Sequence, residues 1–146
     1  MNMIKDAPQR PQRPQSSIEQ EKKLNKITET IIGIAINIHR ELGPGLLESA
    51  YESCMLSDLV QTGLKVEKQK QLYVVYHGIK LDCAYRLDLV IENAIILEIK
   101  SVEKLLAIHK AQLISYLKLS DYKIGLLINF NVRVLREGIV RMVNNL

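Results

Sequence analysis

The chain has 146 residues, 47% of them hydrophobic and 25% charged, which suits one compact globular domain. No apolar run reaches the roughly 18 residues that span a bilayer, and the N-terminus lacks the apolar core of a secretory signal. The two cysteines and three histidines show no zinc-type spacing. These features argue against a membrane protein, a secreted protein and a structural zinc site. We therefore expect a cytoplasmic protein with reduced thiols.

The net charge of +4 is compatible with a nucleic-acid partner but does not demonstrate one. Part of the excess lies in residues 1–17, a stretch rich in Pro, Gln and Arg that we predict to be a disordered tail. A solvated leader is the preferred interpretation of this tail, over a binding arm. Residues 18–146 then form the folded domain.

Hydrophobic residues recur at spacings of three and four from Ile18 onward, which predicts a long amphipathic helix. Its apolar positions are Leu24, Ile27, Ile31, Ile34, Ile38 and Leu42. The helix must stop at Gly43-Pro44-Gly45, because proline lacks a backbone donor and glycine frees the backbone. A second helix is predicted from Leu46 to about Gln61.

Three β-rich runs with short connections predict an antiparallel meander over residues 71–76, 81–91 and 94–100. The turn signal His77-Gly78 lies between the first two.

A helix is expected next over 107–119, followed by a strand buried on both faces over 124–130. The last segment, 138–143, is either a strand or a short helix. The predicted fold class is α/β (α+β), with a central mixed sheet flanked by helices.

Charged residues occur in these strands where aliphatic ones are expected. Strand alternation places Ile96, Glu98 and Lys100 on one face, and Asp88 lies inside an equally apolar run of the preceding strand. Buried carboxylates are normally paired or bind a cation. Two carboxylates and one ammonium suit Mg²⁺-assisted hydrolysis of a phosphodiester. The alternative is a surface ion pair between Glu98 and Lys100; Asp88 brings the two interpretations near balance.

Two helices offer further candidates. His109, Gln112 and Tyr116 lie on one face of the 107–119 helix, where they either form hydrogen bonds within the core or contact a substrate. Glu48 lies near the start of the second helix. It either complements the helix dipole or adds a third acidic group for the metal, and the residues alone leave both interpretations open.

The segment Gly45-Leu46-Leu47-Glu48-Ser49-Ala50-Tyr51 matches the motif G-x-x-E-x-x-Y. The chain resembles the GxxExxY proteins, a bacterial and archaeal group within the PD-(D/E)XK nuclease superfamily, from about Ile27 to Asn144. The segments His39 to Gly45, Arg86 to Leu89, Glu98 to Lys100, Ala111 to Leu117 and Gly125 to Phe130 are also similar to that family.

The resemblance implies a restriction-endonuclease-like core in the order α-β-β-β-α-β and a role for each site residue. Asp88 and Glu98 look like metal ligands, Glu48 like the acidic residue of the first core helix, and Lys100 like the catalytic lysine. Gln112 and Tyr116 resemble the Q-x-x-x-Y element of RecB-like nucleases, which helps position substrate.

The expected function is therefore a Mg²⁺- or Mn²⁺-dependent nuclease acting on DNA. The main alternative is a binding module, for nucleic acid or protein, that retains the fold without catalysis. A homodimer with one site in each subunit is a further alternative. Tyr73, Val75 and Tyr76 could line its interface, although we prefer to place all three in the structural core.

Overall fold

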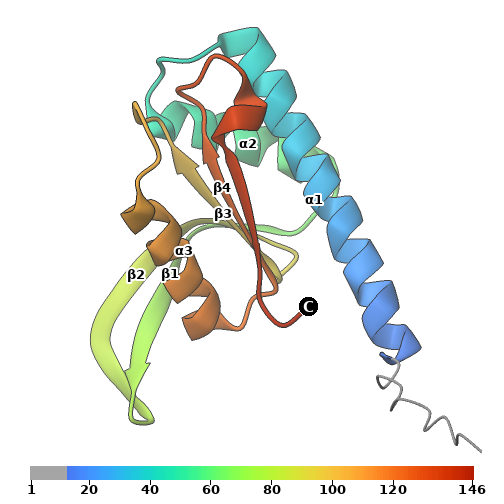
Figure 1. Cartoon of the computed structure of the whole chain (residues 1–146), viewed down its shortest axis with the longest axis vertical. Coiled ribbons are helices and arrows are strands. Elements are labelled where there is room, and N and C mark those ends of the chain that lie inside the picture. The colour runs from blue at the N-terminus through green and yellow to red at the C-terminus, as the bar shows by residue number, and fades with distance from the viewer. Residues whose placement is uncertain (1–12) are drawn as a thin grey trace, which may run out of the picture.

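The computed structural model of the chain describes residues 13–146, which form a five-stranded sheet packed between helices (Figure 1). The helices are α1 (Gln15–Leu42), α2 (Glu48–Gln61), α3 (Ala107–Ser120) and the short 3₁₀ helix η1 (Leu135–Gly138). The strands are β1 (Val66–Tyr76), β2 (Ile79–Ile91), β3 (Ile95–Lys100), β4 (Ile124–Asn129) and β5 (Ile139–Val143).

Helix α1 begins at Gln15, so the prediction that residues 15–17 belong to a disordered tail is wrong. Pro14, with φ −54°, precedes the first turn in a backbone conformation that suits a helix start, and the Arg13 side chain pairs with Glu21 on the next turns. Residues 1–12 of the predicted tail lie outside the described residues. The helix ends as predicted: Gly43 has φ 69°, and its N–H donates to the His39 carbonyl at 2.8 Å.

The strand order is β1-β2-β3-β4-β5, and every neighbouring pair is antiparallel except β3 and β4. The predicted meander of the first three strands is confirmed. Helix α3 is the crossover connection between the two parallel strands, as their geometry requires. The last segment, predicted to be either a strand or a short helix, forms the strand β5. The predicted fold class, a mixed sheet flanked by helices, is confirmed.

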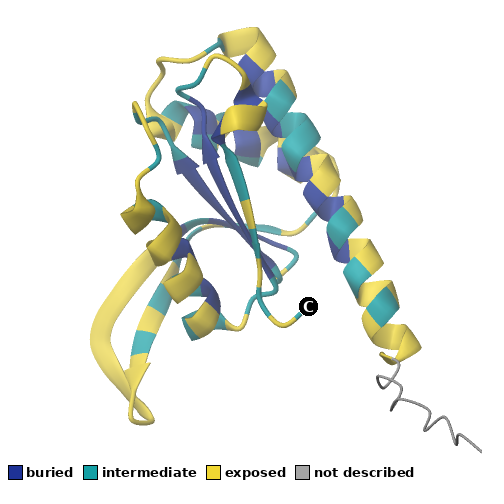
Figure 2. Ribbon diagram, viewed as in Figure 1, coloured by how far each residue is buried: buried dark blue, intermediate teal, exposed yellow. Residues whose placement is uncertain are grey.

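The sheet separates two hydrophobic clusters. On one face, α1 and α2 cover residues such as Leu97 and Ile99 of β3; on the other, Leu113 and Leu117 of α3 pack against Ile96. Figure 2 shows the buried central strands of the sheet with helices on either side. Strands β3 and β4 are buried on both faces because helices cover both. Within residues 13–146, no helix is long and apolar enough to span a membrane.

Strands β1 and β2 extend well past the rest of the sheet as a hairpin (Figure 1). Residues 79–86 of β2 are all exposed. Tyr73, Val75 and Tyr76 are 37%, 54% and 64% exposed, so our preference for placing them in the core was wrong. The physical reason is that β3 has only 6 residues against 13 in β2, so within the described part of the chain no third strand lies beside the outer part of the hairpin.

Gly138 provides a test of the packing at the end of β4. A Cβ atom there would lie 2.3 Å from the Asn129 carbonyl oxygen, and backbone atoms cannot move aside cheaply. We expect Gly138→Ala to lower the free energy of unfolding by about 2–3 kcal/mol, measured by urea denaturation. Gly33→Ala is the matched control, since a Cβ on this helical glycine meets nothing within 4 Å. It should raise stability by about 0.5–1 kcal/mol. Equal stability of Gly138→Ala and wild type would contradict the close approach.

Candidate active site

Asp88 and Glu98 lie side by side where the ladder between β2 and β3 ends. The last regular pair of the two strands is Leu89 with Leu97. Beyond it, the Ile99 N–H donates to Oδ2 of Asp88 at 2.8 Å, and the Asp88 N–H donates to Oε1 of Glu98 at 3.1 Å. Side-chain carboxylates thus take the place of backbone carbonyls as acceptors, which holds both acids in defined positions between the strands.

The two carboxyl groups sit in a poorly solvated environment. Glu98 is only 7% exposed, and burial, reinforced by the charge of Asp88, raises its pKa to about 8. Burial also raises the pKa of Asp88, with the charge of Glu52 adding to the effect. The positive charge of Lys100 opposes both shifts. Near neutral pH Glu98 is therefore mostly protonated, and a bound cation would favour its ionised form.

Lys100 ends β3, two residues after Glu98 and therefore on the same face of the strand. It is half-buried and pairs in register with Asn129 of β4. Its positive charge favours the ionised form of both acids. The E-x-K pattern thus lies at the end of β3, where Glu98 accepts a hydrogen bond from the Asp88 N–H.

Glu48 is the first residue of α2 and is tied to the chain that follows β3. Its Oε1 accepts the Ser101 N–H at 3.2 Å, and the Ser101 hydroxyl donates to the Leu46 carbonyl at 2.6 Å. Because Ser101 directly follows Lys100, Glu48 lies next to the end of β3. Among residues 13–146, however, no three His, Cys, Asp or Glu side chains gather closely enough to hold a metal together. Glu48 is thus held at the end of β3 and does not form a three-carboxylate group with Asp88 and Glu98.

The three polar residues of α3 differ in their surroundings. Tyr116 is half-buried, and its pKa is raised by burial and by the charges of Glu98, Tyr85 and Asp88. Gln112, one turn earlier, is exposed. His109 accepts the Leu106 N–H on Nδ1 at 3.0 Å, which gives it a structural role at the start of α3.

A scan against protein families matched residues 25–142 to the PD-(D/E)XK nuclease superfamily. The chain belongs to this superfamily. Searches of curated proteins and of solved structures found no match. The match covers every strand from β1 to β4, both carboxylates of the acidic pair and Lys100, so it includes the whole candidate site of this PD-(D/E)XK domain.

PD-(D/E)XK nucleases generally use divalent metals, and the residues of this domain suit one. Asp88 and Glu98 supply carboxylate oxygens, the donors that Mg²⁺ and Mn²⁺ prefer, with water completing the shell. Both carboxyl groups have raised pKa values, so ionising the pair costs free energy unless a positive charge is added. The chemistry of the donor set therefore fits a hard divalent cation.

Two residues near Asp88 in this PD-(D/E)XK domain, Glu52 and Gln69, were not among the predicted site residues. Glu52 lies one turn after Glu48 on α2, and its Oε1 accepts a hydrogen bond from Nε2 of Gln69 at 2.7 Å. Gln69 has φ 52°, and the regular β1–β2 register skips it between Lys68 and Lys70, opposite Asp88. The four-residue spacing of Glu48 and Glu52 was visible in the sequence, but it is also typical of an ordinary exposed helix face.

Proposed function

We propose that this chain is a Mg²⁺- or Mn²⁺-dependent nuclease of the GxxExxY group that hydrolyses phosphodiester bonds in DNA. The observation that carries the proposal is the pairing of half-buried Asp88 with buried Glu98, with Lys100 on the same strand face as Glu98. The G-x-x-E-x-x-Y segment supports membership of the group, since it places Glu48 next to the end of β3 and Tyr51 in the core.

In this proposal Asp88 and Glu98 hold the cation, with Glu48 as an additional acidic group nearby. When bound, a divalent cation supplies Lewis acidity, which acidifies water and offsets negative charge on the phosphate. Lys100 donates hydrogen bonds to the phosphoryl oxygens as negative charge develops during in-line attack by water. Tyr116 and the exposed Gln112 position the substrate from α3. The roles of all six residues are predictions.

Metal binding by wild type and Asp88→Asn tests the proposal directly. Asparagine keeps an oxygen that can accept the Ile99 N–H but removes the charge that binds the cation. We expect calorimetric titration with Mg²⁺ or Mn²⁺ to show affinity lowered by about 10- to 100-fold in Asp88→Asn. The control Asp58→Asn, at an exposed position of α2, should bind like wild type.

The same proteins are then incubated with single- and double-stranded DNA and RNA in the presence of metal. Cleavage of DNA by wild type and Asp58→Asn, but not by Asp88→Asn, is the expected result. The binding module would be favoured over the nuclease if wild type bound nucleic acid equally well with and without a chelator and never cleaved it. Absence of metal binding by wild type at millimolar concentration, even with nucleic acid present, would refute the catalytic proposal.

A further inference from the structure

Most of the outer part of the β1–β2 hairpin, residues 70–86, is an exposed and largely apolar surface, and within residues 13–146 it is covered at its inner end alone, by α3. We call it the β1–β2 arm; it projects past the end of α3 (Figure 1). Its exposed large hydrophobic side chains are Tyr73, Val75, Tyr76, Ile79, Leu81 and Tyr85. A two-stranded ribbon gains little stability by itself, and apolar patches on soluble proteins usually mark binding surfaces. The arm is therefore built to contact a partner.

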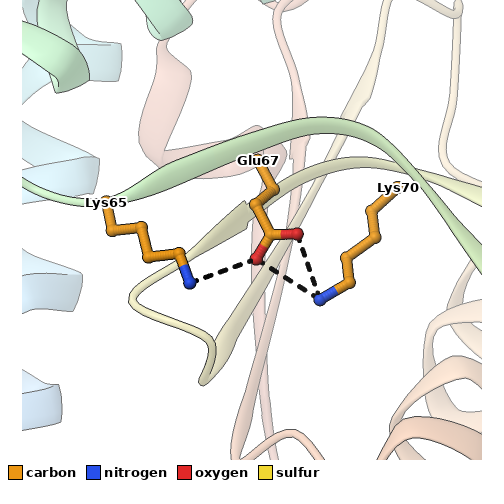
Figure 3. Close-up of polar contacts among 3 residues, drawn as sticks. All are labelled: Lys65, Glu67 and Lys70. Carbon is orange, nitrogen blue, oxygen red and sulfur yellow. Dashed lines mark hydrogen bonds and ion pairs between the residues drawn. The ribbon is translucent and has the colours of Figure 1, made fainter.

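The partner must suit a positively charged surface. The arm carries Lys70, Lys80 and Arg86 against one carboxylate, Asp82. At its base, Glu67 lies between two lysines, 3.8 Å from Lys65 and 3.2 Å from Lys70 (Figure 3). Residues 65–86 contain five basic and two acidic side chains, a net charge of +3, and the net charge of the whole chain is +4. A second copy of the arm would bring like charges together, whereas a polyanion would neutralise them.

The arm leads directly to the acidic pair. Tyr85, at the inner end of the arm, packs against Tyr116 of α3 with ring centroids 5.3 Å apart. Asp88 follows Tyr85 by three residues on the same strand. A polyanion lying along the arm therefore has its backbone close to the site where hydrolysis is proposed.

The aromatic rings of the arm favour a duplex over a single strand. Single strands are bound by stacking bases on free aromatic faces. Here the Lys80 ammonium lies 4.0 Å from the centroid of the Tyr73 ring, the Tyr76 ring packs against His77 at 4.2 Å, and Tyr85 packs against Tyr116. Each tyrosine of the arm thus already has a neighbour against its ring.

The shape of the arm favours B-form DNA over RNA. A two-stranded ribbon fits the B-DNA major groove, which is about 12 Å wide, and apolar side chains can contact thymine methyl groups there. The deep and narrow major groove of A-form RNA does not admit such an element. Lysine and arginine along the ribbon would contact the phosphates that flank the groove.

We propose that the β1–β2 arm lies in a groove of double-stranded DNA and holds the duplex against the Asp88–Glu98 pair. This proposal rests on the proposed nuclease function, because it places the duplex at the acidic pair where hydrolysis is proposed. It narrows the proposed substrate from DNA in general to duplex DNA. Ile79 and Lys80 then contact the duplex directly, and the acidic pair reaches a phosphodiester beyond the inner end of the arm.

Binding is measured by fluorescence anisotropy with a labelled DNA duplex of about 20 base pairs, using the full chain in EDTA so that no cleavage occurs. The arm variant Ile79→Ser/Lys80→Gln is compared with a matched control, Val60→Ser/Lys26→Gln, which changes an exposed apolar residue on α2 and an exposed lysine on α1. We expect the arm variant to bind about tenfold more weakly and the control to bind like wild type. Circular dichroism confirms that both variants are folded.

A second measurement separates this proposal from the nuclease proposal. Hydrolysis of bis(p-nitrophenyl) phosphate, a small phosphodiester that cannot span the arm, should proceed equally in wild type and arm variant if the nuclease proposal holds. If wild type hydrolyses no phosphodiester, the nuclease proposal fails, while the anisotropy result still decides whether the arm binds DNA.

The arm proposal is overturned if the arm variant binds duplex DNA as tightly as wild type, or if wild type binds no duplex DNA. It is also overturned if duplex RNA or single-stranded DNA binds as tightly as duplex DNA. Sedimentation gives the remaining outcome: a dimer of wild type that the arm variant loses, with DNA binding unchanged, would assign the arm to a contact between two copies.

Discussion

Replacing Lys100 by methionine is expected to lower kcat for metal-dependent DNA hydrolysis by about 10²- to 10³-fold. The methionine keeps most of the apolar stem of the side chain but removes the ammonium group, whose positive charge favours the ionised form of Asp88 and Glu98. Because Lys100 is half-buried at the end of β3 and fills no part of the buried core, the free energy of unfolding should change little. Asp88 and Glu98 remain in place, so divalent-metal binding should persist.

The measurement combines single-turnover cleavage of a labelled DNA duplex with calorimetric metal titration. Lys123→Met serves as the control, since Lys123 is also half-buried but immediately precedes β4, at the opposite end of the sheet from Lys100. We expect Lys100→Met to lose cleavage and keep metal binding, and Lys123→Met to keep both. Wild-type cleavage by Lys100→Met would show that the assigned mechanism is wrong.

Glu98→Gln is expected to change the pH dependence of stability in the metal-free protein. The pKa of Glu98 is raised from 4.5 to about 8 in the folded state, so between these values the folded chain holds more protons than the unfolded chain. Stability therefore falls as pH rises through this window, by at most about 1.4 kcal/mol per pH unit. Glutamine is neutral throughout and removes this loss. At pH 8 the variant should be more stable than wild type by on the order of 3 kcal/mol.

Urea denaturation in EDTA at pH 5, 6.5 and 8 checks this result. Glu19→Gln, at an exposed position of α1, should keep the wild-type pH dependence. Adding Mg²⁺ should restore the stability of wild type at pH 8 but not change Glu98→Gln to the same extent, because a cation stabilises the ionised pair. If wild type and Glu98→Gln lose stability equally between pH 5 and 8, Glu98 does not hold the extra proton.

The sequence by itself determined most of the secondary structure and part of the site. The spacing of Ile27, Ile31 and Ile38 predicted α1 because helix periodicity is a local property of the chain. Alternation in β3 correctly placed Glu98 and Lys100 on the face with Ile96, since successive side chains of a strand must point to opposite sides. The order of strands and helices predicted the mixed sheet for similarly local reasons.

Only the tertiary structure decided where neighbouring strands stop pairing and which strands extend past the rest of the sheet. The side chains of Asp88 and Glu98 can accept backbone N–H groups because β2 and β3 lose their regular pairing beyond the Leu89–Leu97 pair. The approach of Glu52 to Asp88 depends on how α2 packs across the sheet. The exposure of Tyr76 follows from the shortness of β3, because a β-rich segment is buried only where neighbouring elements cover it. Such coverage joins residues far apart in the chain, and no local pattern records it.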